Sequence, residues 1–377
     1  MTRHATQFAG AAIAMTLAFA AVIVTPLNGQ TPGAKPAAAK PAPRWVMPRT
    51  PDGKPDLQGN WTNETQTPLE RMSAGGTTLT DEQAKKIEDR AQFVEDYRDK
   101  ASDPNRPAPP KGGEAGRLAP PGERSFIEQI AEAAGGGVGG YNGFWLDPGL
   151  KVIRIDGVAR SSIIIDPPNG RIPGLTDLGK KRMAEIAARS RKYGEFDHPE
   201  MRPLADRCVL SFGSNAGPPM LPNYFYNNNY TIVQSKDTIA ILTEMVHDTR
   251  IVRMNGTHPP AGDRKWFGDS IGRWEGDTLV IETTNFYPMH GFRNSWENLK
   301  VTERLTRKDA RTLNYRFTVE DPTTFTAPFT GELVFNALPA GEMVYEYACH
   351  EANYGLEGVM SGARAQEREA AKKKSQQ

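Results

Sequence analysis

The stretch LKVTERLTRKDARTLNYRFTVED, residues 299–321, decides the fold class. Large apolar side chains recur on one face of each half, at Val301, Leu305, Tyr315, Phe317 and Val319. A period of two residues is typical of strands that bury one face, and the polar residues around Asp309 mark a turn. The stretch therefore predicts an antiparallel β-hairpin.

The position of Glu303 depends on the length of that turn. A three-residue turn at 309–311 would set Glu303 opposite Phe317 on an apolar face, where a carboxylate needs a partner or a proton. A four-residue turn would instead pair Glu303 with Arg316 as a surface ion pair. Alternation alone does not choose between these two registers.

The same pattern recurs outward from this hairpin. Further strands are predicted at 230–234, 238–252, 272–274, 278–286, 329–335 and 343–351, joined by short polar connections. Short connections favour antiparallel pairing of neighbours, and closure of the sheet removes its exposed edges. We therefore predict a mainly β (α+β) protein, in which an antiparallel meander of eight strands closes into a lipocalin-like barrel with an inserted helical and loop region.

Composition divides the chain into five segments. Residues 1–30 have a positive start and an apolar run, as a signal peptide has, and residues 31–55 form a Pro/Ala-rich leader. Residues 56–204 hold a first strand, a helical and Gly/Pro-rich insertion and a hairpin. The barrel is predicted at 205–355, and a charged C-terminal tail at 356–377.

The insertion carries two predicted helices and a glycine cluster. The helix at 78–100 begins with a capping box formed by Thr80 and Gln83, and the second helix spans 176–194. The glycine-rich stretch 135–145 follows no strand and lacks the Gly-Lys-Ser/Thr ending of a phosphate-binding loop. We interpret it as a flexible loop.

The predicted signal peptide indicates a periplasmic or secreted protein. No later segment is apolar enough to span a bilayer, so we expect no stable membrane insertion after signal removal. An uncleaved N-terminal anchor is the alternative. Lys and Arg number 46 against 45 Asp and Glu, and no basic stripe is interleaved with aromatic residues, so nucleic acid is not an expected partner.

The chain has two cysteines, Cys208 and Cys349. In an oxidising compartment an even number of cysteines favours pairing, so we predict a disulfide between them. Two buried free thiols are the alternative. A catalytic thiol is less well supported, because neither cysteine lies in a nucleophile signature.

Several longer motifs extend over nearly all of the chain after residue 30: PRTPDGKPDLQGNW, IIIDPPNGRIPGLT, ADRC, GPPMLP, EMVHDTRIV, GDSIGRWEGDTLVIETTNF, VTERLTR, FTVEDPTTFTAPFT and YEYACHEANYG. They resemble a family of exported bacterial β-rich proteins that has no assigned mechanism. The resemblance implies export and a β-rich architecture, and it brings no catalytic residues. Gly59-Asn60-Trp61 also resembles the Gly-x-Trp of the first lipocalin strand, whose tryptophan plugs one end of the barrel. An ordinary turn followed by a core tryptophan is the alternative.

His247 is the first candidate for chemistry. If 238–252 is one strand, His247 shares a face with Ile241, Met245 and Ile251 and points into the barrel. A buried neutral imidazole suits a general base near neutral pH, although a buried structural histidine is the alternative. Asp248 and Arg250 would then lie on the opposite face as an exposed or inter-element ion pair.

The other candidates follow from the same alternation. Glu303 is the second catalytic candidate and His350 the third, although His350 lies opposite the tyrosine face of its predicted strand and so outside the barrel. Met245, Tyr315 and Phe317 are expected to contact a ligand. The six histidines show no HExxH or i, i+4 spacing, so no metal site is predicted, and no cofactor fingerprint is present.

These residues support two functional hypotheses. The first is an exported barrel that binds a small hydrophobic or aromatic molecule in its cavity. The second is a cofactor-independent acid–base enzyme (a lyase, isomerase or hydrolase) that uses His247 and a carboxylate in the barrel. An envelope-associated structural protein with a filled barrel is a third and weaker interpretation.

Overall fold

The computed structural model describes residues 45–72, 75–98, 147–211, 217–224, 226–288, 290–351 and 353–376. The predicted signal peptide, most of the leader and the glycine-rich stretch 135–145 lie outside these residues. The described residues belong to one compact unit, Trp45–Gln377.

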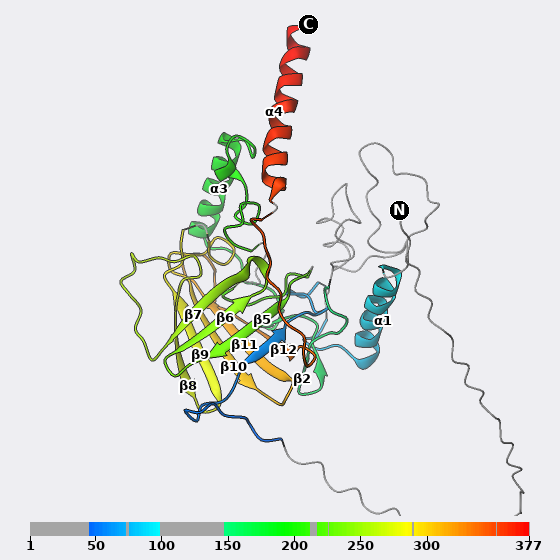
Figure 1. Ribbon diagram of the computed structural model, residues 1–377, viewed down its shortest axis with the longest axis vertical. Coiled ribbons are helices and arrows are strands. Elements are labelled where there is room, and N and C mark those ends of the chain that lie inside the picture. Colours follow the sequence, from blue (N-terminus) through cyan, green and yellow to red (C-terminus); the bar gives the residue numbers. More distant parts are fainter. Residues whose placement is uncertain are drawn as a thin grey trace, which may run out of the picture. The chain divides into compact units, whose positions relative to one another are not determined.

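The predicted closed barrel is confirmed, although nine strands form it where the sequence predicted eight (Figure 1). In order around the barrel they are β1 (Gly59–Thr62), β5 (Asn229–Gln234), β6 (Thr238–Thr243), β7 (Asp248–Met254), β8 (Asp269–Glu275), β9 (Thr278–Thr284), β10 (Lys300–Arg307), β11 (Thr312–Glu320) and β12 (Phe329–Ala337). Strand β1 pairs with both β5 and β12, and this double pairing closes the sheet.

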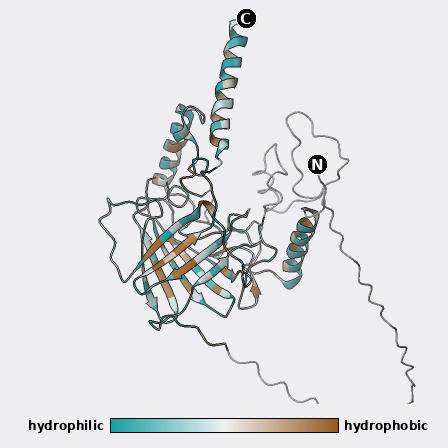
Figure 2. Ribbon diagram, in the orientation of Figure 1, coloured by the Kyte–Doolittle hydropathy of each residue, from teal (hydrophilic) through white to brown (hydrophobic). Residues whose placement is uncertain are grey.

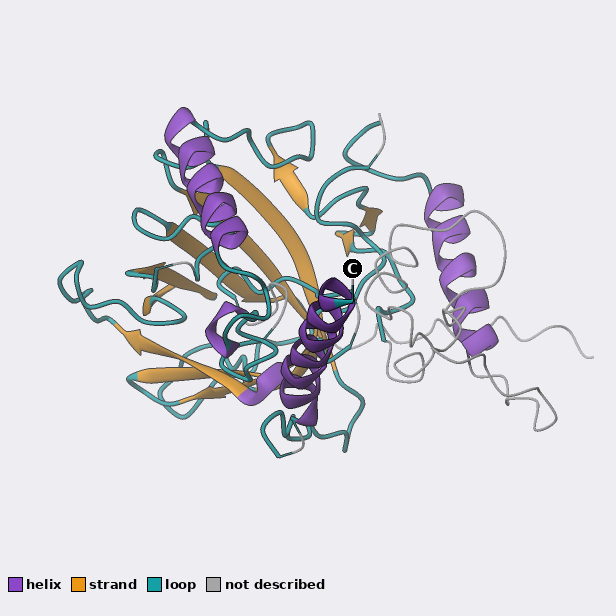
Figure 3. Ribbon diagram, turned by 90° about the horizontal axis from the view of Figure 1, so that it is seen from above, coloured by secondary structure: helices purple, strands orange, loops and turns teal. Residues whose placement is uncertain are grey.

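The remaining elements are not part of the barrel wall (Figure 3). They are the strand β4 (Ile164–Asp166), which pairs with β12, the hairpin β2 (Arg154–Ile155) and β3 (Val158–Ala159), the helices α1 (Asp81–Arg98), α3 (Asp177–Lys192) and α4 (Tyr354–Ser375), and the short 3-10 helices η3 (Pro199–Met201) and η4 (Met245–His247). No described helix combines the length and the apolar character needed to cross a membrane.

The hairpin of β10 and β11 adopts the first of the two predicted registers. Leu305 lies opposite Tyr315, and Glu303 lies opposite Phe317. Glu303 is 0% exposed, so the carboxylate lies on the inner face of the barrel. The alternative, in which Glu303 pairs with Arg316 at the surface, is wrong.

Three features of the predicted meander are also wrong. Residues 238–252 form two strands, β6 and β7, because the chain reverses through a left-handed turn at Val246 (φ 59°) and His247 (φ 46°). Strand β7 then pairs with β8 in parallel, after the connection 255–268. Residues 343–351 form no strand, and Tyr345 there is 73% exposed, so β1 closes the barrel in their place.

The interior of the barrel is filled by large side chains. Figure 2 shows apolar residues concentrated on the barrel strands and mainly polar residues on α3 and α4. Tyr315 and Phe317 are each 0% exposed. Gly331 on β12 lies opposite Phe317, and a Cβ atom at this glycine would lie 2.2 Å from the Cζ of the ring. The aromatic ring therefore occupies the space that a side chain at 331 would need.

Trp61 on β1 is also part of this core and is 1% exposed. Its Nε1 donates a hydrogen bond to the Leu57 carbonyl oxygen at 3.0 Å. The Arg307 guanidinium lies 5.4 Å from the centre of the indole ring, at cation–π distance. The tryptophan of the Gly-x-Trp motif is thus buried on the strand that closes the barrel.

The predicted disulfide between Cys208 and Cys349 is confirmed. The two Cα atoms lie 5.7 Å apart, and 141 positions separate the two cysteines in the sequence. The bridge ties the irregular segment after β12 to the segment before β5. Asn353, the N-cap of α4, also donates from Nδ2 to the carbonyl oxygen of Asp206 at 2.9 Å, so the start of α4 is held at the same place.

Replacing Cys208 and Cys349 together by serine should lower the free energy of unfolding by about 2–5 kcal/mol, because the bridge restricts the unfolded chain over a long loop. Urea unfolding of the oxidised protein and the double variant measures this difference. Reductant should lower the stability of the wild type by a similar amount and leave the variant unchanged. Equal stability of the two proteins without reductant would contradict the expectation.

Candidate functional site

A buried ion pair joins β7 to β10. Arg250 is 3% exposed and Glu303 is 0% exposed. Arg250 Nη2 donates to Glu303 Oε1 at 2.9 Å, and Nη1 donates to Oε2. Tyr315 on β11 donates its hydroxyl proton to Glu303 Oε1 at 2.7 Å and accepts the backbone N–H of Met220 at 2.9 Å. Glu303 therefore orients the guanidinium through two hydrogen bonds, and Tyr315 and Met220 extend the network to two further segments.

The electrostatics of this cluster keep its protons in place. Burial opposes the charge of Arg250, but the attraction of Glu303 exceeds it, so the pKa of Arg250 lies above its ordinary value. Burial, followed by the nearby Glu303 charge, raises the pKa of the Tyr315 hydroxyl well above its usual range. Arg250 thus stays charged and Tyr315 stays a donor over the whole physiological pH range.

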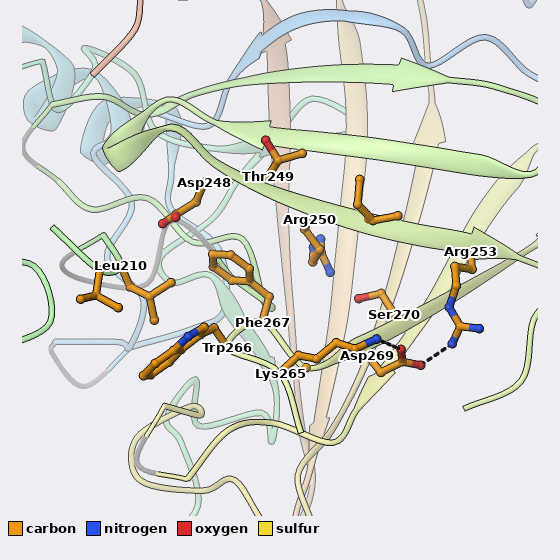
Figure 4. A pocket seen from close by; sticks show the side chains of 13 residues that line it. Leu210, Asp248, Thr249, Arg250, Arg253, Lys265, Trp266, Phe267, Asp269 and Ser270 are labelled. Atoms are coloured by element: carbon orange, nitrogen blue, oxygen red, sulfur yellow. Dashed lines mark hydrogen bonds and ion pairs between the residues drawn. The ribbon is translucent and has the colours of Figure 1, made fainter. Parts of the chain in front are cut away.

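A cleft opens in the barrel wall beside Arg250. The parallel pairing of β7 and β8 covers only Val252–Met254 against Ser270–Gly272, so the first half of β7 has no partner on β8. The resulting cleft has a volume of about 460 Å³ and is lined by 209–210, 248–251, 253 and 265–270. In Figure 4 the Arg250 side chain points from β7 into the space between Phe267 and Ser270.

Ion pairs hold one wall of the cleft in place. Asp269 is 2% exposed and accepts from Lys265 Nζ at 2.9 Å and from Arg253 Nη2 at 2.6 Å (Figure 4). The ring Nδ1 of His258 lies 2.9 Å from the same carboxylate. Burial alone would raise the pKa of Asp269, but these hydrogen bonds outweigh it and lower the pKa. The 255–268 connection is therefore tied to the start of β8.

Asp248 is the titratable group at the other end of the cleft. It is partly buried, and its Oδ2 accepts the backbone N–H of Ser211 at 3.2 Å. Burial raises the pKa of this carboxyl to about 6, although the Ser211 hydrogen bond and the neighbouring His247 act in the opposite direction. Asp248 therefore changes charge within the physiological range.

Aromatic rings gather at the edge of the cleft. The rings of Trp266 and Tyr287 have centres 4.2 Å apart, and the two side chains are 37% and 43% exposed. His290 lies edge-on to Trp266 at 6.0 Å and to Phe267 at 6.3 Å. Burial lowers the pKa of His290 to about 4, so this ring is neutral near pH 7. Trp266 and Tyr287, whose ring planes are inclined by 35°, thus expose aromatic surface at this edge.

The structure corrects the expected position of His247. Its side chain is exposed, and its Nδ1 lies 2.9 Å from the backbone oxygen of Tyr347. The left-handed turn at Val246 and His247 interrupts the alternation on which the inward placement rested. Arg250 is consequently buried and pairs with Glu303, whereas the sequence pattern had suggested an exposed or inter-element ion pair with Asp248.

The other predicted residues fall into two groups. Glu303, Tyr315 and Phe317 lie together in the barrel core, and the rings of Tyr315 and Phe317 have centres 5.9 Å apart. Met245 is buried in η4, and His350 is exposed in the irregular segment before α4. The structure therefore does not bring His350 to the buried Glu303.

Sequence reasoning missed Arg250, Asp248 and the cleft. One signal for Arg250 was present, because a carboxylate on the inner face at Glu303 requires a buried cation. The cleft itself had no comparable signal. The cleft exists because β7 and β8 pair over only three residues each, and the sequence does not show where this pairing begins.

A second group of carboxylates lies near β1. Burial, together with the charge and hydrogen bond of Asp147, raises the pKa of Glu64 to about 8. Burial also raises the pKa of Glu244. Among the residues that the structure describes, no group of three or more His, Cys, Asp or Glu side chains is arranged to hold a metal ion.

The chain matches no family model, no curated protein and no solved structure. A barrel fold supports many unrelated functions, so the fold alone does not assign one.

Replacing Arg250 by methionine should lower the free energy of unfolding by about 3–5 kcal/mol, because Glu303 would be left buried without its cation. Adding Glu303→Gln to this variant should recover at least half of the loss, since the buried charge disappears and Tyr315 keeps an acceptor. Urea unfolding measures both effects.

The matched control is Arg304→Met, which breaks an exposed pair with Glu275 and should change stability by at most about 1 kcal/mol. An Arg250→Met effect as small as this control would show that the buried pair does not stabilise the barrel.

Glu64 should make stability depend on pH. Its pKa is higher in the folded state than in the unfolded chain, so the folded state keeps a proton that the unfolded chain has lost. The free energy of unfolding should therefore fall as pH rises from about 4.5 to about 8, by at most about 1.4 kcal/mol per pH unit.

Glu64→Gln should flatten this fall, whereas Glu185→Gln, at an exposed position on α3, should not. Urea unfolding at intervals between pH 5 and pH 8 compares the three proteins. Part of the fall in the free energy of unfolding should remain in Glu64→Gln, because the pKa values of Glu244 and Asp248 are also raised in the folded state. A slope unchanged by Glu64→Gln would refute the assignment.

Proposed function

We propose that the protein binds a small aromatic molecule in the cleft between β7 and β8. The observation that carries this proposal is the combination of an exposed aromatic surface with a fixed, buried guanidinium. Trp266 and Phe267 supply the apolar wall, and Arg250 lies beside them. Ligand sites typically combine apolar walls with a few oriented polar groups.

The site differs from the central cavity that the sequence analysis expected. The barrel axis is occupied by residues such as Phe317 and Phe335, both 0% exposed. The cleft of about 460 Å³ lies within the size range of small-molecule sites, roughly 300–1,000 Å³. One or two fused rings fit such a volume.

Arg250 still has hydrogen-bonding capacity toward a ligand. Its two terminal nitrogens bind Glu303, but its Nε is buried and has no hydrogen-bond partner among the described residues. A buried donor without an acceptor is costly, so a ligand oxygen placed there would gain a bond without breaking one. The ligand should therefore carry a hydrogen-bond acceptor next to its ring.

The charges around the cleft favour a neutral ligand. Arg250 is balanced by Glu303, and Arg253 and Lys265 share Asp269. Asp248 supplies the remaining negative charge once it is ionised. The three cations and three anions leave no net positive charge to attract an anion, so a carbonyl or phenol oxygen suits Arg250 better than a carboxylate does.

The disulfide also supports a location outside the cytoplasm. Structural disulfides form and persist in oxidising compartments such as the periplasm and the extracellular space. The bridge between Cys208 and Cys349 fits that environment. We therefore propose that the protein binds its ligand after export.

Three bicyclic probes test the binding proposal. The neutral ketone 2-indanone should bind at least about tenfold more tightly than indane, because indane has no acceptor to offer Arg250. Indane-2-carboxylate should bind more weakly than the ketone. Titration calorimetry with the oxidised protein measures all three affinities.

Trp266→Ala should weaken 2-indanone binding about three- to tenfold through loss of ring contact. Trp45→Ala is the matched control, since Trp45 is also 37% exposed but lies outside the cleft. Absence of binding by all three probes, or equal losses in the two tryptophan variants, would overturn the proposal.

A further inference from the structure

Asp248 and Arg250 lie on one face of β7, two positions apart. A strand rises about 3.3 Å per residue, so their Cα atoms are separated by roughly 7 Å along the strand. Both residues line the cleft, and Figure 4 shows both side chains at the edge of β7 that faces it. A carboxylate and a hydrogen-bond donor thus lie along the same wall of the cleft.

Each of the two groups has one polar atom without a hydrogen-bond partner among the described residues. The Ser211 N–H binds only Oδ2 of Asp248, and no described residue donates to Oδ1. Nε of Arg250 likewise lacks a partner among the described residues. One atom can therefore accept a proton while the other stabilises a negative oxygen.

Building on the proposed binding of a neutral aromatic ketone, we propose that the cleft catalyses proton transfer at the carbon next to the carbonyl group, with Asp248 as the base and Arg250 as the oxyanion donor. The carboxylate of Asp248 removes a proton from that carbon. The C–H electron pair forms the C=C bond of an enolate, whose oxygen accepts the Nε–H of Arg250. Return of the proton from Asp248 to the same carbon or to the far end of a conjugated system completes exchange or isomerisation, with nothing consumed.

The surroundings of Asp248 suit this task. Burial raises its pKa to about 6, which makes it a stronger base than an exposed aspartate while leaving it ionised at neutral pH. Arg250, Arg253, Lys265 and Asp269 are the other charged residues that line the cleft, and Arg253 and Lys265 both bind Asp269. His247 precedes Asp248 in the chain and is exposed.

Histidine does not provide an equally good base here. Burial lowers the pKa of His290 to about 4, so its charge does not change between pH 5 and pH 7.5. The ring of His247 contacts the Tyr347 backbone and does not line the cleft. The acid–base group is therefore the residue next to the histidine that the sequence had suggested.

Deuterium exchange tests this activity. In D₂O, the oxidised protein should accelerate replacement of the α-protons of 2-indanone, followed by proton NMR. The enzymatic rate, after subtraction of the buffer rate, should rise with pH through about 6 as Asp248 ionises. Asp248→Asn keeps an acceptor for Ser211 and should reduce the enzymatic rate by about 10²–10⁴-fold, with less than about a threefold change in the Kd of the ketone.

Two control variants sharpen the result. Asp177→Asn removes a fully exposed carboxylate on α3 and should leave the exchange rate and its pH profile unchanged. His247→Gln should also keep the rise of the exchange rate through about pH 6. If this rise disappeared in His247→Gln, the base would be His247, and the assignment to Asp248 would be overturned.

The outcomes separate the two proposals. Failure of 2-indanone to bind would refute the proposed function itself. Binding without faster exchange, or exchange that Asp248→Asn leaves intact, would refute only the catalytic proposal. Binding with exchange that Asp248→Asn abolishes would support both.

Discussion

The ion pair between Arg250 and Glu303 is the interaction on which the rest of the barrel depends. Removing two charges from water costs several kcal/mol per ion, and only a well-placed partner offsets this cost. Both residues are almost fully buried, so neither is tolerable without the other. The pair therefore constrains β7 and β10 together, although the two strands are not neighbours in the sheet.

This constraint also specifies strand register. A slip of one residue between β10 and β11 would turn Glu303 outward and would separate it from Arg250 and Tyr315. The Met220 N–H extends the same network to the segment before β5, because it donates to the Tyr315 hydroxyl. A polar network in an otherwise apolar barrel thus selects one register and one position for this segment.

The cleft is a consequence of how β7 is built. The left-handed turn at Val246 and His247 starts β7 in the phase that points Arg250 inward. Strand β8 then approaches in parallel and pairs with only the last part of β7. The first half of β7, which has no partner on β8, leaves an opening in the wall. This opening lies beside residues such as Arg250, which the barrel holds in place and largely shields from water. The molecule therefore combines a filled centre, where Gly331 makes room for Phe317, with a polar and aromatic opening at its side.

The sequence by itself determined the barrel class, the β10–β11 hairpin and the pairing of Cys208 with Cys349. Each follows from a local period of two, from short turns or from a count of two cysteines, and none requires knowledge of distant contacts. Alternation also placed Glu303 on an apolar face in one of two registers, and it left both registers open. Only the tertiary structure decided between them, because the inward register requires Arg250 as a buried partner from another strand.

The tertiary structure alone also decided the turn at Val246, the parallel β8 and the closure by β1. Positive φ is strained for a β-branched residue, and no glycine or proline in 238–252 signals a reversal there. Alternation fixes which residues share a face only while the strand continues. Once surrounding packing imposes a reversal within an apolar run, the residues after the reversal no longer lie on the faces that the alternation before it predicts. That change moved His247 to the surface and brought Asp248 and Arg250 to the cleft.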